Sequence, residues 1–382
     1  MRSKLCGTLI SIVRCMSELA NDVVVVGSRC AGAATAMLLA RRGLRVTVVE
    51  RARLPSDTLS THGIARGGVV QLARWGLLDA VLASGAPPIR QVVFNVDGDE
   101  TVRTIREHAG VDHLIAPRRY LLDAILTDAA RDAGATIRTG VTATDVLRDD
   151  DGRVVGVRTS AGDLPARLTV GADGVRSRIA RLVGSEIVES HPADAATFYV
   201  YVAALQNRGF EYHVGRGAFA GVFPTHDGEA CVWVCGPASI AAQATTGFAD
   251  LLARVSPSLA ARVRRGHVTS RVRGAARLPN HRRRATGPGW ALVGDAGYHR
   301  DPITGHGMTD AFRDAELLAR NLDDLPEYER QRDAAAGEVF AITREMTRFP
   351  EPARFTELQR RLGRAIDEEA TMLAAQPQGE LV

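Results

Sequence analysis

Lysine is almost missing from this chain of 382 residues. Lys4 is the only one, and the remaining basic residues are arginines and histidines. This excludes chemistry that needs a lysine within the folded body, such as a Schiff base or the lysine of a phosphate-binding P-loop. Long apolar runs are missing too, because none reaches the ~18 residues that a membrane span requires. We therefore expect no membrane-spanning segment.

Cysteines are few, and their spacing does not pair them. The five cysteines are an odd number and include no Cys-x-x-Cys pair (Cys6, Cys15, Cys30, Cys231 and Cys235). This pattern predicts neither a disulfide framework nor a zinc site. We expect no metal and a reducing, cytoplasmic location.

Charge and aromatic content exclude two further kinds of site. The formal net charge is only +4, and the one dense basic cluster covers residues 281–284. A nucleic-acid-binding protein would carry a more extended basic stripe, so we expect no nucleic-acid partner. Aromatic residues make up 5% of the chain, which does not indicate a stacked aromatic cage.

The N-terminus resembles a weak signal peptide. Arg2 and Lys4 precede the short apolar stretch LCGTLISIV, but Arg14 follows almost directly and no small-residue cleavage site is present. Met16 begins a second, natural-looking start. We interpret residues 1–15 as an upstream extension and expect them to be disordered.

The body of the chain begins with a β-α-β pattern at residue 22. Residues 23–26 are four valines, typical of a parallel strand that is buried on both faces. Residues 33–42 are rich in alanine and leucine and predict a helix, which Gly43 would end as a C-terminal cap. Residues 45–49 predict the second strand, and Glu50 closes it.

The loop between this strand and helix reads GSRCAG, which is close to the dinucleotide fingerprint G-x-G-x-x-G. Gly27 and Gly32 hold the outer positions, but Arg29 replaces the middle glycine. The helix N-terminus offers N–H groups and a positive dipole end to a pyrophosphate, and Glu50 stands where an acid should bind a ribose. We predict a nucleotide site at Gly27, Ser28, Arg29, Cys30, Ala31, Gly32, Glu50 and Arg51. The fingerprint alone leaves NAD and FAD open.

The rest of the chain changes character twice. Residues 67–83 and 117–134 predict helices, and residues 91–105 predict a hairpin around an Asp-Gly turn. Residues 196–275 are short alternating runs joined by turns, which predict a mostly antiparallel sheet in a second domain. Residues 325–375 are mainly helical in pattern. The fold class is therefore α/β.

Two distant segments indicate which nucleotide binds. GADGVRSRIA (171–180) and GWALVGDAGYHRDPITGHGMTDAF (289–312) resemble the paired DG and GD motifs of group A flavoprotein monooxygenases. GSRCAG precedes both segments, and PRRYLLDAIL lies between GSRCAG and the first of them, so the four segments follow the order of that family. The resemblance covers most of residues 20–330. Its first and last segments are most similar to geranylgeranyl-reductase-like oxidoreductases.

The resemblance implies FAD as cofactor and a p-hydroxybenzoate-hydroxylase-like fold. A Rossmann-like FAD-binding domain with a parallel sheet would be interleaved with a smaller antiparallel-sheet substrate domain and followed by C-terminal helices. The FAD-binding domain would comprise residues 20–90, 110–190 and 276–325. The substrate domain would comprise residues 91–109 and 191–275, and the C-terminal helices residues 326–382.

The resemblance also assigns further FAD contacts. Arg119, with Arg118 as its alternative, would touch the FAD linker, and Val141 the adenine. The other implied contacts are Asp173, Gly294, Asp295, Pro302, Gly305, Gly307 and Met308. Asp295 would hold a ribityl hydroxyl, and the helix after the loop 302–307 would point its N-terminus at the flavin pyrimidine edge, where negative charge develops on reduction. The alternative for Asp173 and Asp295 is a simple turn.

The family implies an oxidation carried out by the flavin. No second nucleotide-binding fold is present, since GRGAFAG (215–221) has no helix after it. NAD(P)H is then a transient co-substrate, or a separate flavin reductase supplies the electrons. The resemblance implies a monooxygenase that hydroxylates or epoxidises a small organic substrate with O₂ through a flavin C4a-hydroperoxide. The alternatives are an FAD-dependent reductase or dehydrogenase of isoprenoid-like double bonds and a non-catalytic nucleotide-binding regulator.

Few residues are candidates for the reaction itself. His62 and His306 are candidate catalytic bases, with an ordinary structural role as the alternative for each. Phe219, Phe223 and Trp233 alternate along predicted strands and would line a substrate pocket or, alternatively, the core of the sheet. A flavin halogenase would need an active-site lysine and a W-x-W-x-I-P segment, and the body of the chain contains neither.

Overall fold

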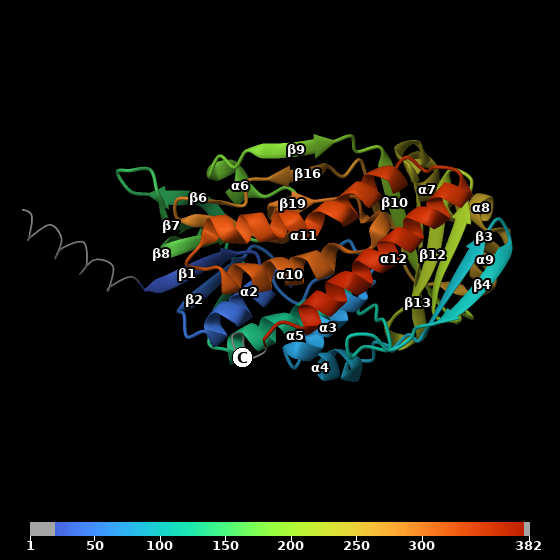
Figure 1. The fold of residues 1–382 in the computed structure, drawn as a ribbon, viewed down its shortest axis with the longest axis horizontal. Coiled ribbons are helices and arrows are strands. Elements are labelled where there is room, and N and C mark those ends of the chain that lie inside the picture. Colours follow the sequence, from blue (N-terminus) through green and yellow to red (C-terminus); the bar gives the residue numbers. More distant parts are fainter. Residues whose placement is uncertain (1–19, 378–382) are drawn as a thin grey trace, which may run out of the picture.

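The structure is a computed structural model that describes residues 20–377, so the predicted extension at residues 1–15 lies outside the described residues. Figure 1 shows an elongated molecule with a parallel sheet towards one end and an antiparallel sheet towards the other. Long C-terminal helices run between the two ends. Among the described helices, none combines the length and the apolar character needed to cross a bilayer.

The first sheet has the strand order β17-β18-β8-β1-β2-β5, with β7 beside β8 and β6 beside β7. Its strands are β1 (Asn21–Val26), β2 (Val46–Glu50), β5 (Thr136–Thr139), β6 (Ala143–Arg148), β7 (Val154–Thr159), β8 (Gly162–Gly171), β17 (Thr286–Gly287) and β18 (Trp290–Leu292). β1 runs parallel to β2 and β8, and β18 runs parallel to β8. The four valines of β1 are buried because helices or strands cover both faces of this central strand.

The helices of this domain follow the predicted β-α-β pattern. α2 (Cys30–Arg41) connects β1 to β2 and packs against α5 (Arg119–Asp132) and α10 (Gly307–Arg320). Gly43 ends α2 with a left-handed φ of +79°, as predicted. The single helix expected over residues 67–83 is instead two, α3 (Arg66–Arg74) and α4 (Leu78–Ala83), because Gly76 takes a φ of +73° between them.

The second sheet has the strand order β14-β10-β13-β12-β11-β3-β4, with β15 also paired to β10. Its strands are β3 (Gln91–Val96), β4 (Asp99–Thr104), β10 (Ala195–Ala203), β11 (Phe210–Gly215), β12 (Ala218–Pro224), β13 (Glu229–Pro237), β14 (His267–Val268) and β15 (Arg273–Ala276). All pairs are antiparallel except β11 with β3. The predicted hairpin is β3 and β4.

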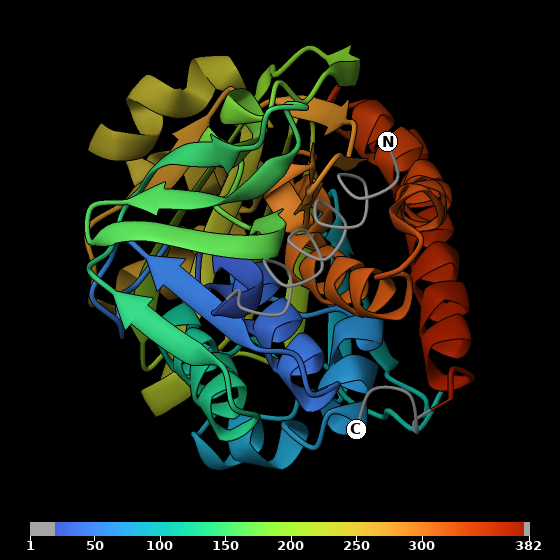
Figure 2. The same ribbon diagram turned by 90° about the vertical axis from the view of Figure 1, so that its left-hand side faces the viewer.

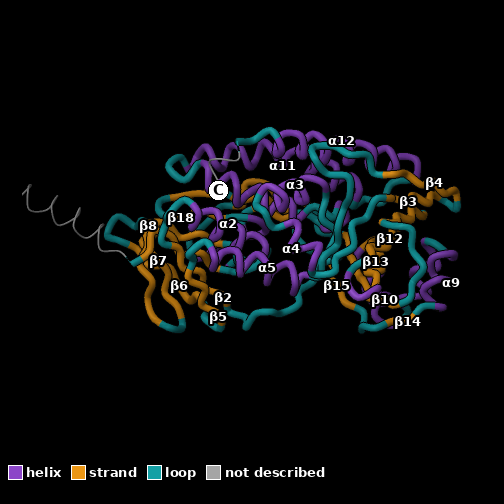
Figure 3. The backbone as a smooth tube through the Cα atoms, turned by 90° about the horizontal axis from the view of Figure 1, so that it is seen from below, coloured by secondary structure: helices purple, strands orange, loops and turns teal. Residues whose placement is uncertain are grey.

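The two faces of the second sheet have different partners because its side chains alternate. One face packs aliphatic residues against α7 (Ala241–Thr246), α8 (Phe248–Val255) and α9 (Pro257–Arg265). Figure 3 shows α9 on the far side of β10 and β13 from the parallel sheet. The other face carries most of the aromatic residues and packs against the C-terminal helices.

The C-terminal helices join the two sheets. α11 (Leu325–Met346) and α12 (Pro352–Ala374) lie side by side along one flank of the molecule (Figure 2). α12 contacts α3 in the first domain and β11 in the second sheet. A third, small sheet consists of β9 (Ile187–His191), β16 (Asn280–Arg283) and β19 (Tyr298–His299). A short helix, α6 (Arg178–Leu182), precedes β9 in the chain.

Candidate functional site

The loop between β1 and α2 is tight because two of its residues have no side chain. Gly27 has a φ of +105°, and a Cβ there would lie 2.5 Å from the carbonyl oxygen of Ala172. A Cβ on Gly32 would lie 1.8 Å from the carbonyl oxygen of Gly27. This backbone therefore requires glycine at both positions. The close packing of strand and helix is the arrangement that lets backbone N–H groups approach a pyrophosphate.

The N-terminus of α2 and Glu50 lie next to one another. Arg29 occupies the N-cap of α2, so the N–H groups of the first turn have no partner within the helix. The Glu50 carboxylate accepts hydrogen bonds from the N–H groups of Ser28 (2.9 Å) and Ala52 (2.8 Å). These bonds hold the acid beside the loop, and each oxygen keeps a lone pair for a ribose hydroxyl.

Arg29 turns its guanidinium away from the helix axis and towards α5. Its Nη1 lies 3.1 Å from Oδ2 of Asp123, and its Nη2 donates to Oγ of Ser56 (3.2 Å). Asp123 also accepts from Arg119 (3.0 Å) and from the thiol of Cys30 (3.3 Å). Two guanidiniums thus share one buried carboxylate, so the group of Arg29, Asp123 and Arg119 carries a net charge of +1.

Asp123 is a residue of this site that the sequence analysis missed. Its side chain is only 2% exposed. Arg119 and Asp123 are four residues apart, which is the spacing of an ordinary ion pair on a helix surface. That spacing was the only sign of Asp123 in the sequence, because Arg29 lies at the start of α2 and meets Asp123 on α5 only in the folded protein. Burial raises the pKa of the Cys30 thiol, so the third group on Asp123 stays neutral.

Asp295 is exposed within an otherwise buried segment. It lies in a 3₁₀ turn, Gly294–Ala296, directly after β18, and both of its neighbours are buried. A Cβ on Gly294 would lie 2.9 Å from the Cβ of Ala31, so this turn abuts the start of α2. Burial lowers the pKa of Arg119, but the negative charges near it, including Asp295, raise that pKa above its usual value. The fold therefore brings Asp295 and Arg119 to the same end of α2.

The other predicted nucleotide contacts lie in different settings. Asp173 accepts a hydrogen bond from the backbone N–H of Arg178 (2.6 Å) at the start of α6, which favours a local structural role for the DG turn. The N–H of Val141 donates to the carbonyl oxygen of Glu50 (3.0 Å), so this residue lies beside the predicted ribose contact. Arg51 follows Glu50 and is exposed.

The predicted flavin loop is built by a capped turn. Asp301 accepts from the N–H of Ile303 (3.0 Å) and caps the 3₁₀ turn Pro302–Thr304. Gly305 then reverses the chain with a φ of +64°, and α10 begins at Gly307. Among the described residues, no atom lies within 4 Å of the position that a Cβ on Gly307 would take. The first turn of α10 therefore presents bare backbone at its open side, while Met308 is buried behind it.

His306 is held from the C-terminal helix. It is 1% exposed, and its Nε2 lies 2.6 Å from Oε2 of Glu369 on α12. Arg313 pairs with Glu369 (3.0 Å) and with Asp310 (2.7 Å), and Arg300 pairs with Asp310 (2.6 Å). The ligand atoms of His306, Asp310 and Glu369 lie as close as those of a metal site, but two guanidiniums already balance the carboxylates. These contacts favour a structural role for His306, joining α12 to the start of α10.

His62 is buried beneath the second sheet. It is 0% exposed and has a φ of +70°. Its Nε2 lies 2.6 Å from the hydroxyl of Tyr201, and the two rings stack at 5.7 Å. Burial and the charges of Arg118 and Arg119 hold the pKa of His62 well below its ordinary value, so the ring is neutral near pH 7. Its neighbours Thr61 and Gly63 line the adjoining cavity.

That cavity, of about 270 Å³, lies between the second sheet, the loop 302–305, the segment 61–66 and α12. Phe219, Phe223 and Trp233 all line it. The ring centroids of Phe219 and Trp233 are 4.9 Å apart, and Tyr212 stacks on Phe219 at 5.8 Å. Strand alternation places these rings on one face of the sheet, where they form an apolar wall of edge-on and tilted rings.

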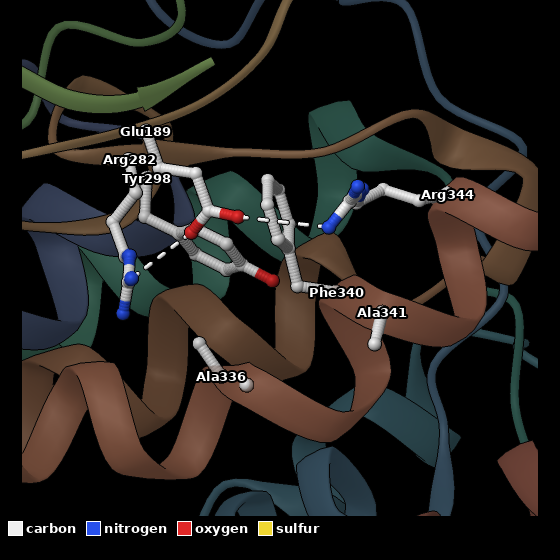
Figure 4. Close-up of a pocket in the computed structure, with 8 residues that line it drawn as sticks. Glu189, Arg282, Tyr298, Ala336, Phe340, Ala341 and Arg344 are labelled. Atoms are coloured by element: carbon white, nitrogen blue, oxygen red, sulfur yellow. Dashed lines mark hydrogen bonds and ion pairs between the residues drawn. The ribbon is translucent and has the colours of Figure 1, made fainter. Parts of the chain in front are cut away.

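A second hollow of about 200 Å³ lies between α11 and the small sheet (Figure 4). Figure 4 shows Glu189 between Arg282 and Arg344. The carboxylate of Glu189 lies 2.9 Å from the guanidinium of Arg282 and 3.8 Å from that of Arg344. The charged groups that line this hollow form ion pairs with one another, and its lining includes none of the predicted site residues. It is therefore separate from the candidate site.

The residues at the N-terminus of α2 fit FAD. Gly27 and Gly32 clear a path for the pyrophosphate, and the Arg29–Asp123–Arg119 group supplies the positive charge that a dianion requires. Asp295 and the exposed start of α10 are the groups that would hold the ribityl chain and the flavin edge.

Comparisons with known proteins agree with this assignment. A relative from Methanothrix thermoacetophila, digeranylgeranylglycerophospholipid reductase, is 27% identical over 308 residues, which is 76% of this chain and 75% of that protein. Ubiquinone hydroxylase UbiL from Rhodospirillum rubrum is 29% identical over 325 residues, which is 79% of this chain and 72% of that protein. The crystal structure of P. aeruginosa PqsL in complex with 2-aminobenzoylacetate is 25% identical, with a TM-score of 0.73 over 91% of this chain and 99% of that one.

The structural likeness confirms the predicted α/β fold, in which a parallel-sheet nucleotide domain is combined with an antiparallel sheet and C-terminal helices. The family model described as "FAD binding domain" matches residues 20–332, which is most of the chain. FAD is thus the cofactor, and NAD(P)H is the reductant typical of such proteins. The chain belongs to the FAD binding domain family, and it is an FAD-dependent oxidoreductase.

Proposed function

We propose that this protein is a monooxygenase that uses FAD, NAD(P)H and O₂ to oxygenate a small, flat organic substrate. The observation that carries the proposal is the position of the 270 Å³ cavity, which is bounded on one side by the aromatic wall and on another by the loop 302–305. A substrate in this cavity would lie against the loop that leads into the bare N-terminus of α10.

The protein's own groups have clear parts in this chemistry. FAD, when bound, supplies the redox chemistry by taking electrons from NAD(P)H and passing them to O₂. The Arg29–Asp123–Arg119 group would bind the pyrophosphate, and Glu50 and Asp295 the sugar hydroxyls. The N-terminus of α10 would stabilise negative charge on the flavin. The aromatic wall at Phe219, Phe223 and Trp233 would position the substrate and exclude water.

The size of the cavity supports a small substrate, and two relatives support oxygenation. At about 270 Å³ the cavity lies just below the range of ~300–1,000 Å³ typical of sites for drug-sized ligands, so it suits a molecule of one or two rings. UbiL is named a hydroxylase, and PqsL was crystallised with the small molecule 2-aminobenzoylacetate. Both are similar to this chain across most of its length.

A second candidate is an FAD-dependent reductase of isoprenoid double bonds. It is favoured by the similarity to the digeranylgeranylglycerophospholipid reductase, which is 27% identical. A long isoprenoid chain exceeds the cavity, so most of such a substrate would have to extend outside it. We therefore rank this function second.

Reduction and reoxidation of the flavin distinguish the two functions. Purified protein should be yellow, and its flavin absorbance should bleach with NAD(P)H or with a separate flavin reductase. When the reduced protein meets air, the monooxygenase should pass through a transient flavin absorbance that is neither oxidised nor reduced, and ¹⁸O from ¹⁸O₂ should enter the product. Anaerobic reoxidation by an isoprenoid alkene, without such a transient, would establish the reductase instead. A protein that does not take up FAD would refute both.

A further inference from the structure

The charges around the cavity are unevenly distributed. Of the residues that line it, three are charged: Arg66, Arg103 and Asp367. The rest of the lining is aromatic, aliphatic or neutral polar. An ionised group inside would lie among these neutral walls without a counter-charge, which is unfavourable in a desolvated site. Any charge on a ligand therefore has to find its partner among these three residues.

Two of the three charged residues already satisfy one another. The Nε of Arg66 lies 2.9 Å from Oδ1 of Asp367. The Nη1 of Arg66 donates to the carbonyl oxygens of Arg106 (3.2 Å) and Val111. Arg66 is 9% exposed, and its Nε and Nη1 already have acceptors in the protein, so it is poorly placed to bind a further anion.

Arg103 differs from this pair. It lies on β4, at the edge of the second sheet, and is exposed. Its guanidinium carbon is 5.9 Å from the ring centroid of Phe94, which itself lines the cavity and stacks on Tyr212 at 5.4 Å. Within residues 20–377, no carboxylate forms an ion pair with Arg103. The cavity therefore has an uncompensated positive charge where it reaches solvent.

We propose that the substrate is an amphiphilic anion, whose uncharged flat ring body enters the cavity while one anionic group, a carboxylate or a group of similar charge, pairs with Arg103 at the mouth. This inference rests on the proposed function in that it takes the cavity as the substrate site. The ring body would replace water along the aromatic wall, and the anion would remain partly hydrated, which avoids the cost of burying it. The planar guanidinium suits a carboxylate because it can donate two parallel hydrogen bonds.

A matched pair of ligands tests the charge. The full-length, FAD-loaded protein is titrated with 2-naphthoate and with 2-naphthamide, which share a ring body and differ in charge, and binding is followed by calorimetry and by the flavin spectrum. The wild type should bind the naphthoate about two- to fivefold more tightly at low salt, the range of an exposed ion pair. That preference should shrink in 0.5 M NaCl, where the Debye length is about 4 Å.

Two arginine variants locate the effect. Arg103→Gln should abolish the preference for the naphthoate, and Arg103→Glu should reverse it, with little change in naphthamide affinity. Arg106→Gln is the control, because Arg106 is an exposed arginine three residues further on that does not line the cavity. It should keep the wild-type preference.

The inference fails if Arg103→Gln keeps the wild-type preference, if Arg106→Gln loses it equally, or if neither naphthalene binds. These measurements need neither NAD(P)H nor turnover. A protein that oxygenates substrates but shows no charge preference would overturn this inference and leave the proposed function standing. A protein that shows the charge preference but oxygenates no substrate would overturn the proposed function and leave the inference about Arg103 standing.

Discussion

Replacing Gly307 by alanine should separate the stability of the protein from its affinity for FAD. Gly307 is the first residue of α10 and is exposed between the buried residues His306 and Met308. In the described part of the chain, a Cβ here would meet no atom within 4 Å. Alanine favours a helix over glycine by up to about 1 kcal/mol, so the variant without FAD should be as stable as the wild type or slightly more stable.

The affinity for FAD should fall in the same variant. If the first turn of α10 packs against the flavin, the added methyl group takes up the contact distance between backbone and ring. Overpacking of a well-fitted contact costs about 1–3 kcal/mol, which corresponds to a dissociation constant about 5- to 150-fold higher. The thermal shift produced by FAD should decrease accordingly.

Two other glycines are matched controls for Gly307. Gly337 lies in α11, is exposed and also has no described atom within 4 Å of its Cβ position, so Gly337→Ala should add stability and leave FAD affinity unchanged. Gly32→Ala should destabilise the protein itself, because its Cβ would lie 1.8 Å from the carbonyl oxygen of Gly27. Thermal melts with and without FAD and titration of flavin fluorescence measure all three. Wild-type FAD affinity in Gly307→Ala would show that the start of α10 does not contact the flavin.

Three further variants test the electrostatics of the site. Arg29→Gly should keep the fold and weaken FAD binding in a titration, because it removes one guanidinium near the pyrophosphate; unchanged or tighter binding would show that the arginine is only tolerated there. Asp123→Asn should destabilise the FAD-free protein by about 3–5 kcal/mol, the cost of breaking the buried pair of Arg119 and Asp123, and FAD should stabilise it more than the wild type; equal melting shifts with FAD would contradict this. Burial raises the pKa of Asp301 to about 6, so the folded state favours the protonated acid, and this stabilisation is present below about pH 4 and lost as the pH rises through 6. In urea unfolding, Asp301→Asn should be more stable than the wild type at pH 8, by up to about 3 kcal/mol, and equal to it at pH 4, whereas a gap independent of pH would refute the sign.

The sequence alone predicts structural features that depend on residues close together in the chain. The valine run of β1, the glycine turn into α2 and the hairpin of β3 and β4 all form where the local pattern predicts them. Strand burial, left-handed turns and helix caps depend on neighbours in the chain, so composition and spacing suffice to predict them. The same is true of the FAD family, whose motifs are short and occur in a characteristic order.

Contacts between distant groups depend on how the whole chain folds. Arg29 pairs with Asp123 from 94 residues away, and His306 with Glu369 from 63 residues away. The cavity likewise takes its walls from β3, β11, β12, β13, the flavin loop and α12. A local pattern shows which face of an element is buried but not which side chain it meets, because that depends on how whole elements pack. For this reason the sequence indicated the cofactor. The partner of Arg29, the surroundings of the two histidines and the size and charge of the cavity became visible only in the folded structure.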